Sequence, residues 1–480
     1  MERLNRIGKI SLENTAKNRA SRIGVGFEKL DRGVFEPEKA YDYVEKLGLH
    51  WVRIQSGWAR TETEKGVYHF EWLDSIVDNF VKRNLEPWIC LCYGNPVYTP
   101  HAAPVFGAVG CPPIETEEEK EGWRHYVTEV VTRYKGKVRY FEVWNEPDMK
   151  YSWKHSWDDG VHVPNPVEYG KFCADTADAI HAANPEAKVI GLAVSHSYDL
   201  TYISTAMQQG LADKIDAMAF HVYAIDDRLR PVFIKNLRAL IDCYNPNIEL
   251  IQGEAGAQTR GDGAGAMHSC AWSEEKQVKY LLRGTIHDLA AGVTFSSYFT
   301  TVDMIEAQFG VVGHVNTYLD YGYFGLLSAS FDENGVATGT YKPKPSYYAM
   351  QNLCTVFRED FEACELPVRR LVNPSRWVHA TDCADTTVCS YGFRRKNGSA
   401  ALAYWNSVHI LSATYGGTIS FEIACLDVSK IRLVDLATGD IYEIPEKMIL
   451  DKGNGCIELV NIPLTDSPML LTFGDFLLDD

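Results

Sequence analysis

Eight short apolar runs alternate with amphipathic segments between about residues 20 and 355, and this alternation limits the fold more than any other feature. The runs predict strands at 22–27, 51–56, 87–93, 138–144, 188–194, 217–223, 248–253 and 293–299. Apolar residues at helical spacing predict helices at 37–48, 71–84, 117–136, 166–184 and 341–353. Eight strand-helix repeats favour an α/β fold, a (β/α)8 TIM barrel. The competitor is a doubly wound sheet, but no GxGxxG fingerprint follows the first run.

The pattern changes after about residue 360, where short alternating segments are separated by Gly, Asn, Asp or Pro. Such segments predict an antiparallel β-sandwich. They lie at 376–383, 387–395, 399–406, 418–426, 430–444, 456–463 and 469–476. We therefore expect a catalytic barrel over 21–358 and a β-sandwich domain over 359–480. Residues 1–20 fit neither pattern, and our hypothesis is that they add a strand to the sandwich.

Composition and charge exclude several classes of partner. The chain has 480 residues, with 64 acidic against 47 basic residues and a net charge of −17, which disfavours nucleic acid and anionic membranes. The N-terminus carries no apolar signal segment, and no apolar run is long enough to span a membrane. The twelve cysteines form no C-x-x-C pair, which is typical of reduced thiols. We expect a cytoplasmic protein without cofactor or metal, and homo-oligomer formation stays open.

The most informative residues stand where the apolar runs end, because active sites of such barrels lie at the C-terminal ends of the strands. The fourth run ends at Asn145, Glu146 and Pro147, and the seventh at Gly253 and Glu254. Both carboxylates can therefore face one pocket. Paired carboxylates carry out glycoside hydrolysis: one is the acid and base, and the other is a nucleophile at about 5 Å or a base for water at a longer distance. Alone, either glutamate would more often be a solvated loop residue or an ion-pair member.

The sequence Trp-Asn-Glu-Pro at 144–147 after a fourth strand, with a glutamate ending a seventh, resembles the clan A glycoside hydrolases. These are retaining enzymes on (β/α)8 barrels, and the resemblance covers about residues 20 to 355. With the trailing sandwich, the layout most resembles glycoside hydrolase family 39, the β-xylosidase family. The resemblance implies that Glu146 is the acid/base and Glu254 the nucleophile. It also implies that Asn145 hydrogen-bonds the sugar 2-hydroxyl.

Three further residues are expected to support the carboxylates. Arg53, on the second strand, matches the clan arginine beside the nucleophile, where a guanidinium keeps a carboxylate ionised and oriented. His221 and Tyr223 end the sixth run, and a phenol there can donate a hydrogen bond to the nucleophile. Arg53 and Tyr223 would keep Glu254 ionised, and its negative charge would raise the pKa of Glu146. The alternatives are a structural ion pair for Arg53 and a core position for His221.

Sugar subsites need aromatic platforms and hydrogen-bonding side chains. The candidates that follow the strands are Glu28, Trp58, Tyr93, Asn95, Trp153, His196 and Phe299, with Asp31, Arg32, Tyr98, His155 and Trp157 in the same loops. Clan members often place a tryptophan at the end of strand eight. Here Phe299 or Tyr298 would take that place, so the sugar specificity stays open. For any one of these aromatic residues, loop packing is an equally good interpretation.

The leading hypothesis is a retaining, exo-acting β-glycosidase that hydrolyses oligosaccharides or small glycosides through a covalent glycosyl-enzyme intermediate. Exo action is inferred from the expected cytoplasmic location, and the Pro- and Gly-rich loop 94–113 is expected to wall the pocket. A transglycosidase on the same site is the second hypothesis. The third is a non-catalytic carbohydrate-binding barrel, against which Arg53 and both carboxylates argue. The β-sandwich is expected to be structural packing.

Overall fold

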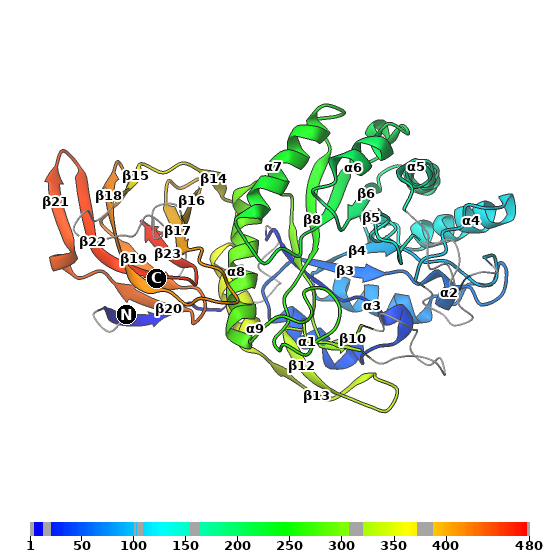
Figure 1. Cartoon of the computed structure of the whole chain (residues 1–480), viewed down its shortest axis with the longest axis horizontal. Helices are drawn as coiled ribbons and strands as arrows, with labels where there is room; N and C mark the ends of the chain where they lie inside the picture. Colours follow the sequence, from blue (N-terminus) through cyan, green and yellow to red (C-terminus); the bar gives the residue numbers. More distant parts are fainter. Residues whose placement is uncertain are drawn as a thin grey trace.

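The computed structural model describes residues 4–12, 21–99, 102, 109–153, 164–306, 320–371 and 387–477. Eight parallel strands, β2 to β9, close into a barrel in sequence order (Figure 1). They are β2 Ile23–Gly26, β3 Trp51–Gln55, β4 Glu86–Leu91, β5 Tyr140–Val143, β6 Lys188–Val194, β7 Ala217–His221, β8 Glu249–Ala255 and β9 Ser296–Tyr298. Each expected strand is present. Because β9 pairs with β2, the sheet is closed, and the doubly wound alternative is wrong.

Helices surround the barrel (Figure 1). They are α1 Tyr41–Glu45, α2 Trp58–Thr61, α3 Glu71–Lys82, α4 Glu117–Arg133, α5 Pro166–Ala183, α6 Leu200–Met207, α7 Leu229–Asp242, α8 Glu274–Ala290 and α9 Pro345–Val356. α4 begins at a capping box in which Thr116 and Glu119 satisfy each other's backbone N–H groups. The helix expected at 341–353 begins later, at Pro345, because residues up to Pro343 belong to β13 (Ala337–Pro343). Proline favours the first helical turn, where it has no hydrogen bond to lose.

Strand alternation fills the barrel in layers. Trp51, Trp88, Tyr140 and Phe295 pack together at the N-terminal end, with the Trp51 and Phe295 rings stacked at 4.1 Å. Residues two positions further along a strand point to the same side. The inward positions above this aromatic layer therefore include Arg53 on β3, Glu142 on β5 and Ser297 on β9. The polar side chains of the barrel interior thus lie directly above a layer of apolar rings.

The C-terminal region forms two antiparallel sheets, of which one has the order β1-β20-β19-β23-β17-β16-β14 and the other β15-β18-β22-β21. The strands are β1 Asn5–Lys9, β14 Glu362–Cys364, β15 Val368–Leu371, β16 Val388–Arg394, β17 Ala400–Asn406, β18 Gly416–Ala424, β19 Ile431–Asp435, β20 Asp440–Glu443, β21 Ile449–Gly453, β22 Cys456–Thr465 and β23 Met469–Phe473. Side chains of both sheets share one hydrophobic cluster, with Leu402 and Leu471 from the first and Phe421 and Leu459 from the second. The strand expected at 376–383 lies outside the described residues.

The N-terminal strand β1 pairs antiparallel with β20, so a segment that precedes the barrel extends the edge of the larger sheet. Figure 1 shows both chain ends in this part of the molecule. Among the described residues, no helix is long and apolar enough to cross a membrane.

Helix α8 stands between the barrel and the C-terminal sheets (Figure 1). Arg283 of α8 donates to Asp227 at 2.9 Å, and His287, one turn later, lies 3.1 Å from the same carboxylate. From the sheet side, Ser407 and Trp405 donate to Asp227 at 2.8 and 3.3 Å. We call Asp227, Arg283, His287, Trp405 and Ser407 the interdomain network.

Candidate active site

Glu146 and Glu254 reach the same space from the ends of β5 and β8. Together with Nδ1 of His221, one oxygen of each carboxylate lies within 4.8 Å of the others. Glu146 has a left-handed backbone, with φ +47°, and its N–H donates to the Ala193 carbonyl at 3.0 Å. The chain thus turns sharply after β5 and is fixed to the end of β6. The barrel brings together two carboxylates that stand 108 positions apart in the sequence.

A bulge in β8 aims Glu254. Ile251 belongs to the barrel interior, so strict alternation would point Gly253 and Ala255 inward and Glu254 outward. The pairing of β8 with β9 shifts register between Gln252 and Ala255. Such a bulge re-aims one side chain, and it turns Glu254 toward Arg53.

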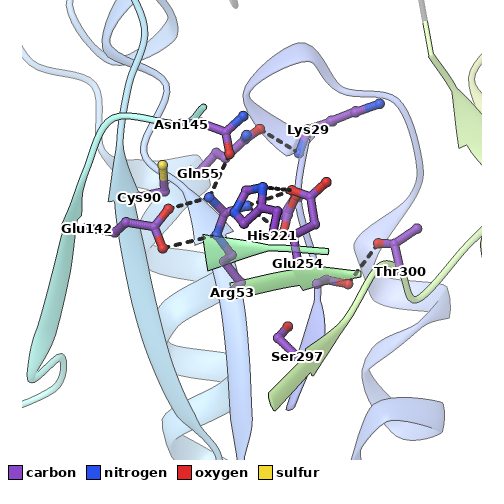
Figure 2. A network of polar contacts seen from close by, with 12 residues as sticks. Lys29, Arg53, Gln55, Cys90, Glu142, Asn145, His221, Glu254, Ser297 and Thr300 are labelled. Atoms are coloured by element: carbon purple, nitrogen blue, oxygen red, sulfur yellow. Dashed lines mark hydrogen bonds and ion pairs between the residues drawn. The ribbon is translucent and has the colours of Figure 1, made fainter. Parts of the chain in front are cut away.

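Arg53 is the centre of the site (Figure 2). Its Nη1 lies 3.0 Å from Glu254 and 3.1 Å from Glu28, and its Nη2 and Nε contact Glu142. Nη2 also donates to Oδ1 of Asn145 at 2.7 Å. Three carboxylates therefore share one fully buried guanidinium. Because the Asn145 oxygen accepts from Arg53, its amide N–H groups remain for another acceptor.

His221 and Tyr223, at the end of β7, each form a hydrogen bond with a different one of the two carboxylates. Nδ1 of His221 lies 2.9 Å from Oε1 of Glu146 and 3.9 Å from Oε2 of Glu254. The Tyr223 hydroxyl donates to Oε1 of Glu254. They stand two positions apart at the end of β7, so both point inward.

The environment shifts the two pKa values in opposite directions. Burial is the main cause of the raised pKa of Glu146; the charge of Glu254 adds to it, and His221 opposes it. Burial also acts to raise the pKa of Glu254, but the charges of His221 and Arg53 and the Tyr223 hydrogen bond outweigh burial and lower it. Burial raises the pKa of Glu28 to about 7, against the charge of Arg53. One carboxyl of the pair thus retains its proton while the other loses it.

Phe299 lies on the pocket side of β9. It continues the inward phase of Phe295, and the Lys29 ammonium, whose charge also lowers the pKa of Glu254, lies 5.5 Å from its ring centroid. Tyr298 points to the other side, where its hydroxyl donates to the Ala257 carbonyl at 3.3 Å. Of the two expected platforms at the end of strand eight, Phe299 is therefore the one on the side of Lys29, and it is 5% exposed.

Two tryptophans expected to hold sugar have packing roles instead. Trp58 is fully buried and stacks on Tyr98, with ring centroids 5.2 Å apart. Trp153 is also fully buried and lies edge-on to Trp144 at 5.6 Å. Their loops fold back over the outer helices and form an aromatic layer of their own. Neither ring presents a face to solvent, so neither can serve as a platform.

Asn95 is also used internally: its amide donates to the Glu62 carbonyl at 2.8 Å, and its oxygen accepts from the Val97 N–H at 3.0 Å. Tyr93 is nearly buried, and its hydroxyl accepts from Gln55 at 3.5 Å. His196 is partly exposed and lies 3.0 Å from Asp148. His155, Trp157 and residues 100, 101 and 103–108 of loop 94–113 lie outside the described residues.

Sequence reasoning missed several residues of the site. Glu142 could have been found, because it stands in phase with the inward Tyr140 within an apolar strand. Glu306 could not: it follows the short strand β10 (Met304–Ile305), and its partly buried carboxylate lies 3.0 Å from the Lys29 ammonium. A Cβ at Gly265 or Gly322 would lie 2.8 or 2.7 Å from its side chain. Two glycines distant in sequence thus make room for this carboxylate.

Tyr151 was also missed, although it follows Glu146 by five positions. Tyr151 is 45% exposed. Its pKa is raised first by burial of the hydroxyl and then by the negative charges of Glu146, Glu306 and Glu254. Tyr151 is therefore an exposed residue within electrostatic reach of both central carboxylates.

Among the residues that the structure describes, two groups of side chains have the composition of metal sites. In the first, Glu146, His221 and Glu254, the Glu254 oxygens already face Arg53 and Tyr223. In the second, Asp227, His287 and Cys389, the aspartate accepts from Arg283 and Ser407. A guanidinium at 3.0 or 2.9 Å competes with a cation for the same lone pairs. Both sets fit hydrogen-bond networks better than metal coordination.

Residues 33–237 match the model of the glycosyl hydrolases family 39. A β-xylosidase of Geobacillus stearothermophilus is 28% identical over 142 residues, which are 28% of this chain and 26% of that protein. The chain thus spans about a quarter of the length of this curated relative. A β-xylosidase of Caldicellulosiruptor saccharolyticus is 27% identical over 165 residues, 32% of each protein.

A solved structure of a family 39 glycoside hydrolase from Bacteroides cellulosilyticus WH2 has a TM-score of 0.65 to this structure at 17% sequence identity. The match covers 96% of this chain and 82% of that protein's chain. This likeness establishes the fold. Residues 33–237, a little under half of the chain, are thus similar to glycosyl hydrolase family 39.

Proposed function

We propose that the protein is a retaining β-glycosidase that releases the terminal sugar of oligosaccharides or small glycosides through a covalent glycosyl-enzyme intermediate. The observation that carries this proposal is the pair Glu146 and Glu254, which lie within 4.8 Å of one another and have pKa values shifted in opposite directions. Retaining glycosidases hold their carboxyl groups about 5 Å apart, whereas inverting enzymes leave roughly 6.5–9.5 Å for a water.

In the first step, ionised Glu254 attacks the anomeric carbon while Glu146 donates its proton to the departing oxygen. The bond from the anomeric carbon to the leaving group breaks, and a glycosyl ester to Glu254 forms. In the second step, Glu146 takes a proton from water, which attacks the same carbon and releases Glu254. Arg53 and Tyr223 hold Glu254 ionised and oriented. His221 contacts Oε1 of Glu146, so Oε2 is the oxygen that can present the proton.

The proposed substrate contacts come from the polar and aromatic side chains that surround Glu146 and Glu254. Asn145 accepts from Arg53 and can donate its amide N–H to the sugar 2-hydroxyl, a contact that strengthens in the transition state. Lys29 and Glu306 form a partly buried donor and acceptor pair beside Phe299, on the Glu254 side. These groups suit the hydroxyls and the apolar face of one terminal sugar, which supports exo action. The named relatives make β-xylosides the first substrates to test.

Experiments can distinguish hydrolysis from the two alternative functions, transglycosylation and sugar binding without catalysis. A transglycosidase would form the same intermediate and pass the sugar to another sugar, so product analysis with excess acceptor separates transfer from hydrolysis. A non-catalytic binding barrel has no use for two carboxyls with opposite pKa shifts. It would bind sugars and release none.

The test is hydrolysis of aryl β-glycosides (xyloside, glucoside, galactoside, fucoside and arabinosides) by wild type and by variants of each glutamate. We expect wild type to cleave at least one, and Glu254→Ala to be inactive. Glu249→Ala is the matched control: it lies at the opposite end of β8, where it accepts a hydrogen bond from Tyr140 at 3.0 Å. This variant should keep wild-type activity.

Added azide then separates the roles of the two glutamates. In Glu254→Ala, azide attacks in place of the carboxylate and yields a glycosyl azide of inverted configuration. In Glu146→Ala, azide attacks the glycosyl-enzyme and the configuration is retained. The same configuration from both variants, or activity in Glu254→Ala without azide, contradicts the proposed roles.

A further inference from the structure

The loop that follows β6 presents two rings beside the acid/base glutamate. Tyr198 is 62% exposed, and the side chain of His196 is 39% exposed. Their ring centroids lie 5.5 Å apart at an interplanar angle of 72°. Large apolar surface at such exposure contributes little to a core, and grouped exposed rings often mark binding sites.

Asp148 fixes this loop relative to Glu146. It stands two residues after Glu146, and its carboxylate accepts the backbone N–H groups of Ser195 at 2.9 Å and His196 at 2.6 Å. The same carboxylate lies 3.0 Å from Nδ1 of His196. These contacts, made by a side chain that is only 4% exposed, set the distance between the rings and the carboxyl that donates the proton.

The pKa of His196 and the packing of Tyr198 also indicate where the two rings lie. The hydrogen bond to Asp148 is the main cause of the raised pKa of His196, and the charge of Glu146 contributes. Tyr198 is backed by Phe233 of α7, with ring centroids 6.0 Å apart. The exposed Val232 and Leu229 continue the apolar surface along α7. The patch therefore begins beside Glu146 and continues onto α7.

We propose that His196 and Tyr198 form the leaving-group subsite, in which the second sugar of a β-linked oligosaccharide stacks its CH face on the Tyr198 ring. The inference rests on the proposed function. Glu146 protonates the oxygen that joins the two sugars, so the departing sugar must lie on the side of Glu146. A tyrosine ring offers an apolar face and loses little conformational entropy when it binds.

The test compares two substrates that share a glycone and differ in the leaving group. One is the β-linked disaccharide of the sugar that wild type hydrolyses fastest, and the other is the glycosyl fluoride of that sugar, which has no second ring. We expect Tyr198→Ala to reduce kcat/KM for the disaccharide about tenfold more than that for the fluoride. Tyr198→Phe, which keeps the ring, should restore the wild-type ratio.

Tyr348→Ala is the matched control, because Tyr348 is an exposed tyrosine of α9 and should leave both substrates unaffected. Equal effects of Tyr198→Ala on the two substrates, or no effect on either, overturn the leaving-group subsite while the proposed function stands. If wild type hydrolyses no aryl β-glycoside and no glycosyl fluoride, the proposed function fails, and the subsite with it.

Discussion

Two buried charge networks in this molecule are built in opposite ways. At the barrel mouth, one guanidinium, Arg53, faces the carboxylates of Glu28, Glu142 and Glu254. In the interdomain network, one carboxylate, Asp227, faces Arg283, His287 and neutral donors. The first network has more anions than its cation can neutralise, and the second has more donors than its anion needs.

The pKa values record the difference. Burial and neighbouring charge raise the pKa of Glu28 and Glu146, whereas in the interdomain network the donors around Asp227 lower its pKa in spite of burial. The Asp227 carboxylate, surrounded by donors, stays ionised and stabilises the fold, while burial leaves Glu28 and Glu146 with protons that chemistry can use. The comparison predicts that equivalent substitutions damage activity in one network and stability in the other.

The largest effect is expected from one substitution made in both networks. Arg53→Met removes the cation that keeps Glu254 ionised, so kcat/KM on the best aryl glycoside should fall by about two to four orders of magnitude. Arg283→Met should unfold at lower urea but keep wild-type kcat while folded. Steady-state kinetics and urea titrations on both variants check this. Equal activity losses would mean that the two networks do not differ in function.

Asp227→Asn should lower the free energy of unfolding by about 3 kcal/mol, because it leaves Arg283 and His287 without their buried counter-charge. The control is Asp226→Asn, which breaks a half-exposed pair with Arg228 and should cost about 1 kcal/mol or less. Urea denaturation at pH 7 measures both. If the two costs are the same, Asp227 does not hold the domains together.

His221→Gln should move both limbs of the pH-rate profile to higher pH. The charge of His221 lowers the pKa of Glu254 and that of Glu146, so its loss raises both. The acidic limb follows ionisation of Glu254, and the alkaline limb follows loss of the Glu146 proton. Both limbs should therefore move to higher pH by on the order of one pH unit. His287→Gln, in the interdomain network, should leave the profile in place. Movement of only one limb would contradict the shared contact.

The smallest effect concerns Glu28. Its pKa rises from the usual 4.5 to about 7 on folding, so the folded state binds an extra proton between these values. This contribution to stability is full below pH 4.5 and is lost as the pH rises through 7. Glu28→Gln should therefore become more stable relative to wild type as the pH increases, as urea midpoints at pH 5 and 8 will show. The exposed Glu118→Gln should show no such trend.

Much of the fold was accessible from local pattern. Each barrel strand was predicted because an apolar run is a local property, and the Asn145-Glu146-Pro147 end of one strand marked the side of the candidate site. The aromatic candidates fared less well. Trp58 and Trp153 follow strands as a sugar platform would, but burial depends on how loops fold over outer helices, which no short window of sequence contains.

The sequence by itself determined the strands of the barrel and the two carboxylates at strand ends, and the family resemblance added the arginine beside them. Only the tertiary structure decided which side chains share Arg53 and which way Glu254 points. The reason is that side-chain direction depends on register, and the bulge between Gln252 and Ala255 reverses the direction that alternation predicts. Glu306 and its two glycines meet only because distant segments fold to the same barrel mouth.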